Sequence, residues 1–231
     1  MPLFYFDYYY FLLVIPAMLL AMWAQYKVKS TYKKYSNVSN IRGITGAYAA
    51  QAVLTHYGIT DVRIERCAGN LTDHFDPKSK VIRLSDGVYN SSSVAAVGIA
   101  CHEAGHAAQH AESYLPIKVR NTLVPVCNIG STLGIPLALI GYFMGFEPLI
   151  YFGLILYGLI FLFHVVTLPV EFNASRRALK VIEDTGLLYN DENDSAKKVL
   201  KAAAMTYVAS MIVALANLLR IVLRFTRNRR N

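Results

Sequence analysis

The chain has 231 residues, of which 55% are hydrophobic and only 16% carry a charge. Its 23 Lys and Arg against 15 Asp and Glu give a formal net charge of +8 at pH 7. The apolar content excludes a disordered chain, and the charges are too few to cover an ordinary soluble domain. Cys67, Cys101 and Cys127 form no CxxC pair and give no disulfide framework. We therefore expect an integral membrane protein with one small polar domain.

Three apolar stretches are long enough to cross about 30 Å of hydrocarbon. The first covers residues 8–26, with aromatic anchors at its ends, and the others cover 123–146 and 149–168. Because only the turn at 145–148 separates the last two, they must form an antiparallel hairpin with both outer ends on one side of the membrane. A fourth stretch, 202–219, carries a narrow polar stripe, so crossing the bilayer and lying along its surface both remain open.

Lys and Arg are distributed unevenly among the segments. Residues 1–26 and 145–148 contain none, residues 27–122 contain twelve, and residues 169–201 contain six. By the positive-inside rule the N-terminus lies outside and the two basic segments face the cytoplasm. This orientation explains the positive charge, so no nucleic acid partner is expected. The predicted segments are an N-terminal transmembrane helix (1–26), a cytoplasmic part (27–122), a transmembrane hairpin (123–168), a second cytoplasmic segment (169–201), and an apolar helix with a basic tail (202–231).

The polar segments combine short helices with strands. Residues that can cap helix N-termini precede apolar residues at helical spacing, and apolar residues alternate with charged ones in the strands. In chain order the sequence predicts a helix at 45–57 capped by Thr45, a strand at 61–67, a β-hairpin of 71–76 and 80–84, an Ala-rich helix from the serines at 91–93 to about Glu112, and a helix at 169–183.

The Ala-rich helix carries His102-Glu103-Ala104-Gly105-His106, an HExxH motif. Residues four apart share a helix face, so the two imidazoles can reach one metal ion, while Glu103 points about 100° away and can hydrogen-bond a water at the metal. Zinc is expected because it accepts nitrogen and carboxylate ligands and keeps an open position in catalytic sites. Glu103 would then be the general base for attack on a carbonyl. The alternative is a structural helix with hydrogen-bonded histidines.

A third ligand must come from another segment. Glu112 stands where a longer HExxHxxGxxH motif would need a histidine, and His110 lies about 80° from the His102 face. Glu171 is the better candidate, because the membrane hairpin returns it to the side of the membrane that holds His106. The alternative for this residue is a surface acid before a basic helix.

HEAGHAAQH, a hydrophobic hairpin and LPVEFNASRRA follow one another in this order. With GNLTDHFDPKSKVIRLS and AAAMTYVA, they make nearly the whole chain resemble the YugP-type bacterial membrane zinc metallopeptidases, and more distantly the HtpX-like membrane proteases. The resemblance implies a multi-pass protein of the bacterial cell membrane that acts on a peptide or protein substrate. It also implies His102, His106 and Glu171 as zinc ligands and Glu103 as general base.

The resemblance suggests further site residues. In HtpX-like proteases an aspartate four residues after the ligand glutamate steadies a ligand histidine; here Ser175 occupies that place, and Asn173 is an alternative. In related HExxH peptidases an edge strand before the zinc helix pairs with the substrate, which would place His74 near the cleft. His74 and Tyr207 are candidates for stabilising the oxyanion, although a structural hydrogen bond explains His74 equally well.

The sequence thus predicts a mostly α membrane protein with a small α+β, zincin-like cytoplasmic domain that contains a β-hairpin and the HExxH helix. The predicted function is zinc-dependent hydrolysis of peptide bonds at the cytoplasmic membrane face, with water activated by Glu103. The alternative is a non-catalytic membrane adaptor or chaperone-like protein with a structural metal site. A closed site with four ligands would favour that alternative.

Overall fold

The computed structural model of the chain describes residues 8–228, except the side chains of 135 and 224–228. The start of the first predicted segment (1–7) and the end of the predicted basic tail (229–231) lie outside the described residues. The chain divides into two compact units. The apolar unit comprises Met1–Gln25, Lys118–Leu168 and Thr206–Asn231, and the polar unit comprises Tyr26–Ile117 and Pro169–Met205.

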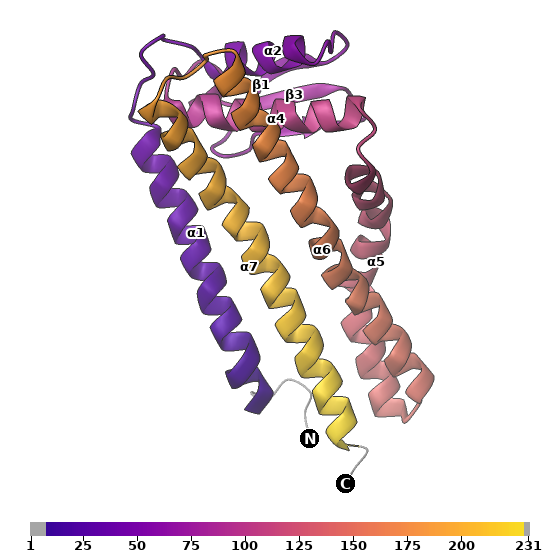
Figure 1. Cartoon of the computed structure of the whole chain (residues 1–231). Coiled ribbons are helices and arrows are strands. Elements are labelled where there is room, and N and C mark those ends of the chain that lie inside the picture. Colours follow the sequence, from indigo (N-terminus) through magenta and orange to yellow (C-terminus); the bar gives the residue numbers. More distant parts are fainter. Residues whose placement is uncertain (1–7, 229–231) are drawn as a thin grey trace. The chain divides into compact units, whose positions relative to one another are not determined.

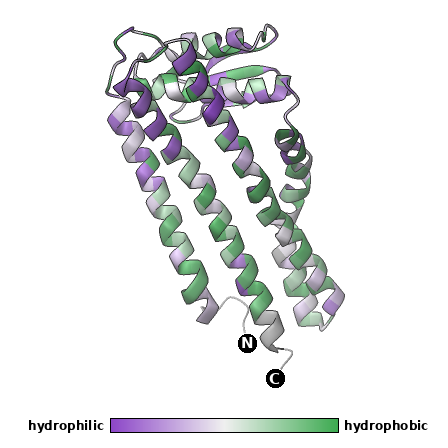
Figure 2. Ribbon diagram, viewed as in Figure 1, coloured by the Kyte–Doolittle hydropathy of each residue, from purple (hydrophilic) through white to green (hydrophobic). Residues whose placement is uncertain are grey.

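Four long helices carry most of the apolar residues (Figures 1 and 2). They are α1 (Ile15–Tyr35, which continues a π-helical turn at Tyr10–Val14), α5 (Leu115–Met144), α6 (Glu147–Asp184) and α7 (Asp191–Asn228). By length and composition, all four can cross a membrane. The fourth apolar stretch, which the sequence leaves undecided, is therefore a candidate span within α7.

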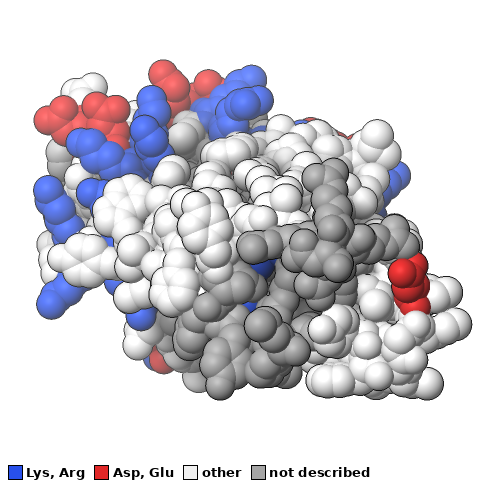
Figure 3. Space-filling view, turned by 90° about the horizontal axis from the view of Figure 1, so that it is seen from below, with Lys and Arg blue, Asp and Glu red and all other residues white. Residues whose placement is uncertain are grey.

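Helices α5 and α6 form the predicted antiparallel hairpin. Gly145 turns the chain with a φ of +66°, a conformation that favours glycine. The two backbones approach closely: a Cβ added to Gly153 would lie 2.5 Å from the carbonyl oxygen of Gly134. Such small residues let membrane helices pack backbone against backbone. In Figure 3, Lys and Arg are sparse among the described atoms at the centre of the face seen from below, and the hairpin turn at 145–148 contains none.

Helix α6 corrects one prediction. The sequence predicts a separate helix at 169–183, but the third apolar stretch continues through Pro169 as a single helix. Proline lacks the N–H for a helical hydrogen bond and normally ends or kinks a helix. Membrane helices tolerate an internal proline where neighbouring groups satisfy the freed backbone carbonyl. Glu171 is consequently carried on the direct continuation of the third stretch.

A three-stranded mixed sheet lies in the polar unit. The strand β1 (Arg63–Cys67) pairs in parallel with β3 (Val81–Ser85), and β3 pairs antiparallel with β2 (His74–Asp76), so the order is β1-β3-β2. The hairpin of β2 and β3 confirms the prediction. Its first strand is shorter than expected because Leu71 adopts a φ of +56°, which ends the extended conformation. The local sequence pattern did not predict the parallel pairing.

The helices α2 (Gly46–His56), α3 (Asp86–Tyr89) and α4 (Val94–Ala111) complete the core of the polar unit. Thr45 and Ser93 accept the capping hydrogen bonds of α2 and α4, as predicted. Helix α4 packs against α2, α3, β2 and β3 (Figure 1), and most of its alanines are fully buried. The helix with the HExxH motif therefore runs through the core of this unit.

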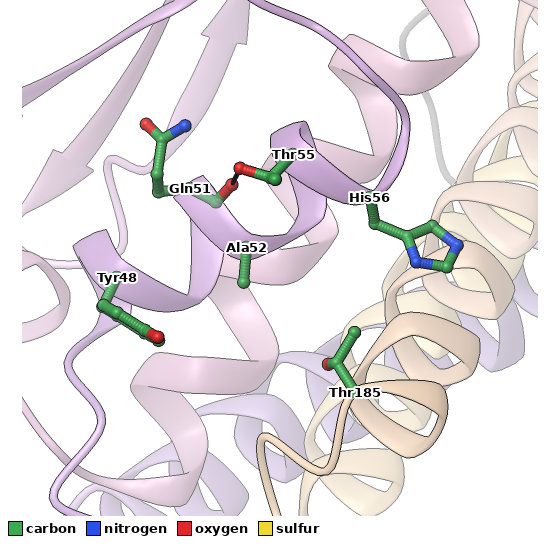
Figure 4. A pocket seen from close by; sticks show the side chains of 6 residues that line it. All are labelled: Tyr48, Gln51, Ala52, Thr55, His56 and Thr185. Atoms are coloured by element: carbon green, nitrogen blue, oxygen red, sulfur yellow. Dashed lines mark hydrogen bonds between the residues drawn. The ribbon is translucent and has the colours of Figure 1, made fainter.

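A hollow opens on the other face of α2 (Figure 4). Thr185, which follows the end of α6, faces it across the gap. No residue of the HExxH motif lines this hollow, so it is separate from the candidate site. Its lining from α2 consists of Tyr48, Gln51, Ala52, Thr55 and His56.

Candidate metal centre

Helices α4 and α6 bring three predicted ligands together in the polar unit. The ligand atoms of His102, His106 and Glu171 lie within 4.8 Å of one another. Nε2 of His102 is 3.3 Å and Nε2 of His106 is 3.6 Å from Oε2 of Glu171. Glu171 is only 2% exposed. A carboxylate and two imidazoles thus converge in a largely buried place.

Gly105 makes this close approach of α4 and α6 possible. A Cβ at this position would lie 2.7 Å from the backbone oxygen of Ala174 in α6. Carbon and oxygen atoms do not approach so closely without a shift of one backbone. The glycine inside the HExxH motif is therefore required by helix packing, and it sets the distance between the two histidines and Glu171.

The second ring nitrogen of each histidine has its own partner. Ser175 Oγ lies 3.1 Å from Nδ1 of His102, and Gln109 Oε1 lies 3.0 Å from Nδ1 of His106. The other predicted partner, Asn173, accepts a hydrogen bond from Nε2 of Gln109 at 2.9 Å. Partners of this kind fix the ring orientation and leave Nε2 to the metal. Gln109 was not predicted from the sequence, although its position three residues after His106 puts both on one helix face.

Glu103 is adjacent to the three converging side chains and is held by the sheet. Its Oε2 accepts a hydrogen bond from the backbone N–H of Phe75 in β2 at 3.1 Å. Burial raises the pKa of Glu103, and the charges of His102 and His106 offset this only in part. A raised pKa makes the carboxylate a better proton acceptor near neutral pH. The contact of Phe75 with Glu103 has no signal in the sequence, because its donor is a main-chain group.

The charge state of Glu171 suits a metal ligand. Burial alone would raise the pKa of its carboxyl, but hydrogen bonds and charges from His102 and His106 outweigh burial and hold the pKa well below its ordinary value. Burial lowers the pKa of His106, whereas its contacts with Glu171, Glu103 and Gln109 more than compensate and raise it. The low pKa keeps the Glu171 carboxyl ionised, and because metals bind neutral imidazole, a raised pKa of His106 makes protons compete with the metal at this cluster.

The donor set fits zinc. Two imidazole nitrogens and one carboxylate oxygen form a common ligand set of catalytic zinc sites. Donors about 2.1 Å from a tetrahedral ion lie about 3.4 Å from one another, close to the Nε2–Oε2 distances of 3.3 and 3.6 Å. The group found within residues 8–228 has three such side chains, which leaves the fourth position that catalytic sites keep open.

Two other candidates were predicted from sequence, His74 and Tyr207. His74 is exposed, and its Nδ1 lies 2.8 Å from the carbonyl of Thr72, which is the structural hydrogen bond considered as its alternative role. Tyr207 belongs to the apolar unit, whereas the cluster belongs to the polar unit. Its role at an oxyanion remains a prediction.

Residues 10–226 match the family described as "Putative neutral zinc metallopeptidase". The chain belongs to this family. It is also 46% identical over 217 residues to a protein of Bacillus subtilis (strain 168) named "Putative membrane protease YugP", a similarity that covers 94% of this chain and 96% of that protein. No solved structure matches the chain significantly. The resemblance inferred from the motifs is confirmed, and the family is one of zinc metallopeptidases.

The similarity of this zinc metallopeptidase to its family is not confined to the HExxH motif. The matched range contains the three converging side chains, Glu103 and the whole polar unit. It also contains all four candidate spans of the described residues. The family match therefore spans both the cluster and the candidate spans.

Proposed function

We propose that the protein is a membrane endopeptidase in which His102, His106 and Glu171 hold zinc and Glu103 is the general base. The observation that carries this proposal is the convergence of the three donors within 4.8 Å beside Glu103. Membership in a zinc metallopeptidase family supports the activity, and the four candidate spans support the membrane location. A group of three donors favours a catalytic site over the closed site expected of an adaptor protein.

The mechanism depends on where the chain holds and moves protons. Bound zinc would polarise the scissile carbonyl and lower the pKa of water at the site. Glu103 accepts the proton of the attacking water and passes it to the leaving amine. The Phe75 N–H orients this carboxylate, and burial keeps its pKa raised for the transfer.

The substrate docks at β2 in this proposal. This strand is an edge of the sheet, and its Phe75 N–H contacts Glu103 directly. An edge strand offers main-chain groups with which an extended peptide can pair. A peptide held there runs past the general base, and His74 of the same strand and Tyr207 of α7 are the candidates for stabilising the oxyanion.

Zinc content tests the ligand assignment. We expect the protein purified in detergent to hold roughly one zinc ion per chain and to cleave casein or a peptide library. The variants His102→Ala and His106→Ala should lose the metal and the activity, because each removes one of three donors. His56→Ala, from the hollow on α2, is the matched control and should keep both. Zinc retained after both ligand substitutions, or a zinc-loaded protein that cleaves no peptide, contradicts the proposal.

The cytoplasmic orientation has its own test. We expect the polar unit to face the inside of the cell because of its positive charge. We also expect α7 to cross the bilayer, and the Arg220 guanidinium, 4.8 Å from the Tyr10 ring of the first candidate span, supports this expectation. In a Cys67→Ser background, an impermeant thiol reagent should label Glu147→Cys and a cysteine added at the C-terminus in intact cells. Ser79→Cys should react only after lysis. Labelling of Ser79→Cys in intact cells would show that the polar unit faces the outside. A C-terminal cysteine that is not labelled in intact cells would show that α7 does not cross the membrane.

A further inference from the structure

Gln109 is a fully buried polar side chain with a partner for every polar atom. Its Oε1 lies 3.0 Å from Nδ1 of His106, and its Nε2 lies 2.8 Å from the carbonyl of Val170 and 2.9 Å from Oδ1 of Asn173. A buried amide is stable only when its donors and acceptors are paired. Gln109 therefore joins the HExxH helix to α6 immediately beside the cluster.

The partners of Gln109 determine which way its amide faces. The carbonyl of Val170 can only accept a hydrogen bond, so the amide nitrogen must point to it and the amide oxygen must face His106. The hydrogen of that contact then comes from Nδ1 of His106. The lone pair of the imidazole is left on Nε2, which is the atom that points to Glu171.

The hydrogen bonds continue from Asn173 to a charged group. Oδ1 of Asn173 also accepts from Nε of Arg177 at 2.8 Å, so its orientation is fixed by two donors. Arg177 is 17% exposed in its side chain and pairs with Glu112 at 2.7 Å. Its guanidinium also lies over the rings of Tyr57 and Tyr114, at 5.5 and 6.0 Å from their centroids. These contacts leave Arg177 little freedom to move.

We propose that Arg177 is a positioning residue for the metal centre, acting through Asn173 and Gln109 on the imidazole of His106. The inference rests on the proposed function in taking zinc as the ligand. Arg177 holds Asn173, Asn173 holds the amide of Gln109, and Gln109 holds His106 in the tautomer and orientation that present Nε2. The far end of this relay is the ion pair with Glu112, at the C-terminal end of the HExxH helix.

The sign of the effect separates this role from simple electrostatics. A positive charge near a dication weakens the binding of that ion. If Arg177 acted only through its charge, its removal would therefore tighten zinc binding. Loss of a positioning contact weakens zinc binding instead. Arg176 is exposed and adjacent, so Arg176→Met measures the effect of charge without the relay.

Zinc affinity, measured by chelator competition on the full-length protein in detergent, tests the relay without any activity assay. Gln109→Met should weaken zinc binding about 10–100-fold, as substitutions of ligand partners do, and Arg177→Met about 3–10-fold. Arg176→Met should leave it unchanged or slightly tighter. In the double variant, Arg177→Met should add nothing to Gln109→Met, because both act on one imidazole. Unchanged or tighter binding in Arg177→Met, or additive effects in the double variant, overturns the proposal.

Two substitutions at Asn173 test the relay in a second way and separate it from a folding defect. Asn173→Asp keeps an oxygen for both donors and should keep zinc affinity within about threefold, whereas Asn173→Leu should weaken it about tenfold. The absorption spectrum of the cobalt-loaded protein should change in Asn173→Leu and be restored in Asn173→Asp. Equal affinities for the two variants contradict the relay. If the wild-type protein binds no zinc, the proposed function fails instead, so the two failures are distinguishable.

Discussion

The Glu103→Gln variant is expected to lose peptide hydrolysis while it keeps its zinc. The glutamine retains the shape of the side chain and can still accept the hydrogen bond from the Phe75 N–H. It cannot accept a proton from water, and a positioned general base contributes about 10²–10⁴-fold to the rate. Because the three donors of the cluster are unchanged, metal content should stay at the wild-type level. Hydrolysis rate and zinc content are measured on the same preparation.

The matched control for this prediction is Glu183→Gln. Glu183 is exposed and lies on the same helix as Glu171, but outside the cluster. It should change neither zinc content nor rate. Hydrolysis within tenfold of the wild-type rate in Glu103→Gln would show that another group takes the proton. Loss of zinc in that variant would show that Glu103 belongs to the donor set.

The sequence was sufficient to predict that the three candidate ligands converge, because this depends only on helix geometry and on the course of the chain through the membrane hairpin. The spacing of His102 and His106 places both on one face of any helix. Glu171 followed from the membrane hairpin, which returns the chain to the side of the HExxH helix, and the structure indeed brings the three side chains together. These inferences needed only helix geometry and the length of two apolar stretches.

The surroundings of the ligands were harder to predict because they depend on contacts between distant segments. Phe75 reaches Glu103 through its backbone, and any residue type at that position has the same N–H group. The role of Gln109 can be assigned only when it is known that Val170 and Asn173 lie beside it. The same reason explains the unforeseen parallel pairing of β1 with β3 and the passage of α6 through Pro169, where packing overrides a local signal.

A substitution at Gly105 is expected to weaken both folding and zinc binding, because this residue limits how closely α4 can approach α6. In Gly105→Ala the new Cβ meets a backbone oxygen at 2.7 Å, so the helices must separate at the metal centre. Overpacking of this kind costs about 1–3 kcal/mol of stability, and we expect zinc binding to weaken at least tenfold because Glu171 moves away from both histidines.

Gly98 in the same helix provides the comparison for Gly105. A Cβ there would meet the Cβ of Ala196 at 3.5 Å, which is ordinary contact. Gly98→Ala should therefore stabilise the protein by up to about 1 kcal/mol through helix propensity, and leave zinc affinity unchanged. Gly105→Ala should thus lower both the thermal midpoint of the zinc-free protein and the zinc affinity, whereas Gly98→Ala should raise the midpoint and leave the affinity unchanged. If Gly105→Ala behaves like Gly98→Ala, the spacing of α4 and α6 does not determine the metal centre, and the three donors must be held in place by their hydrogen-bond partners alone.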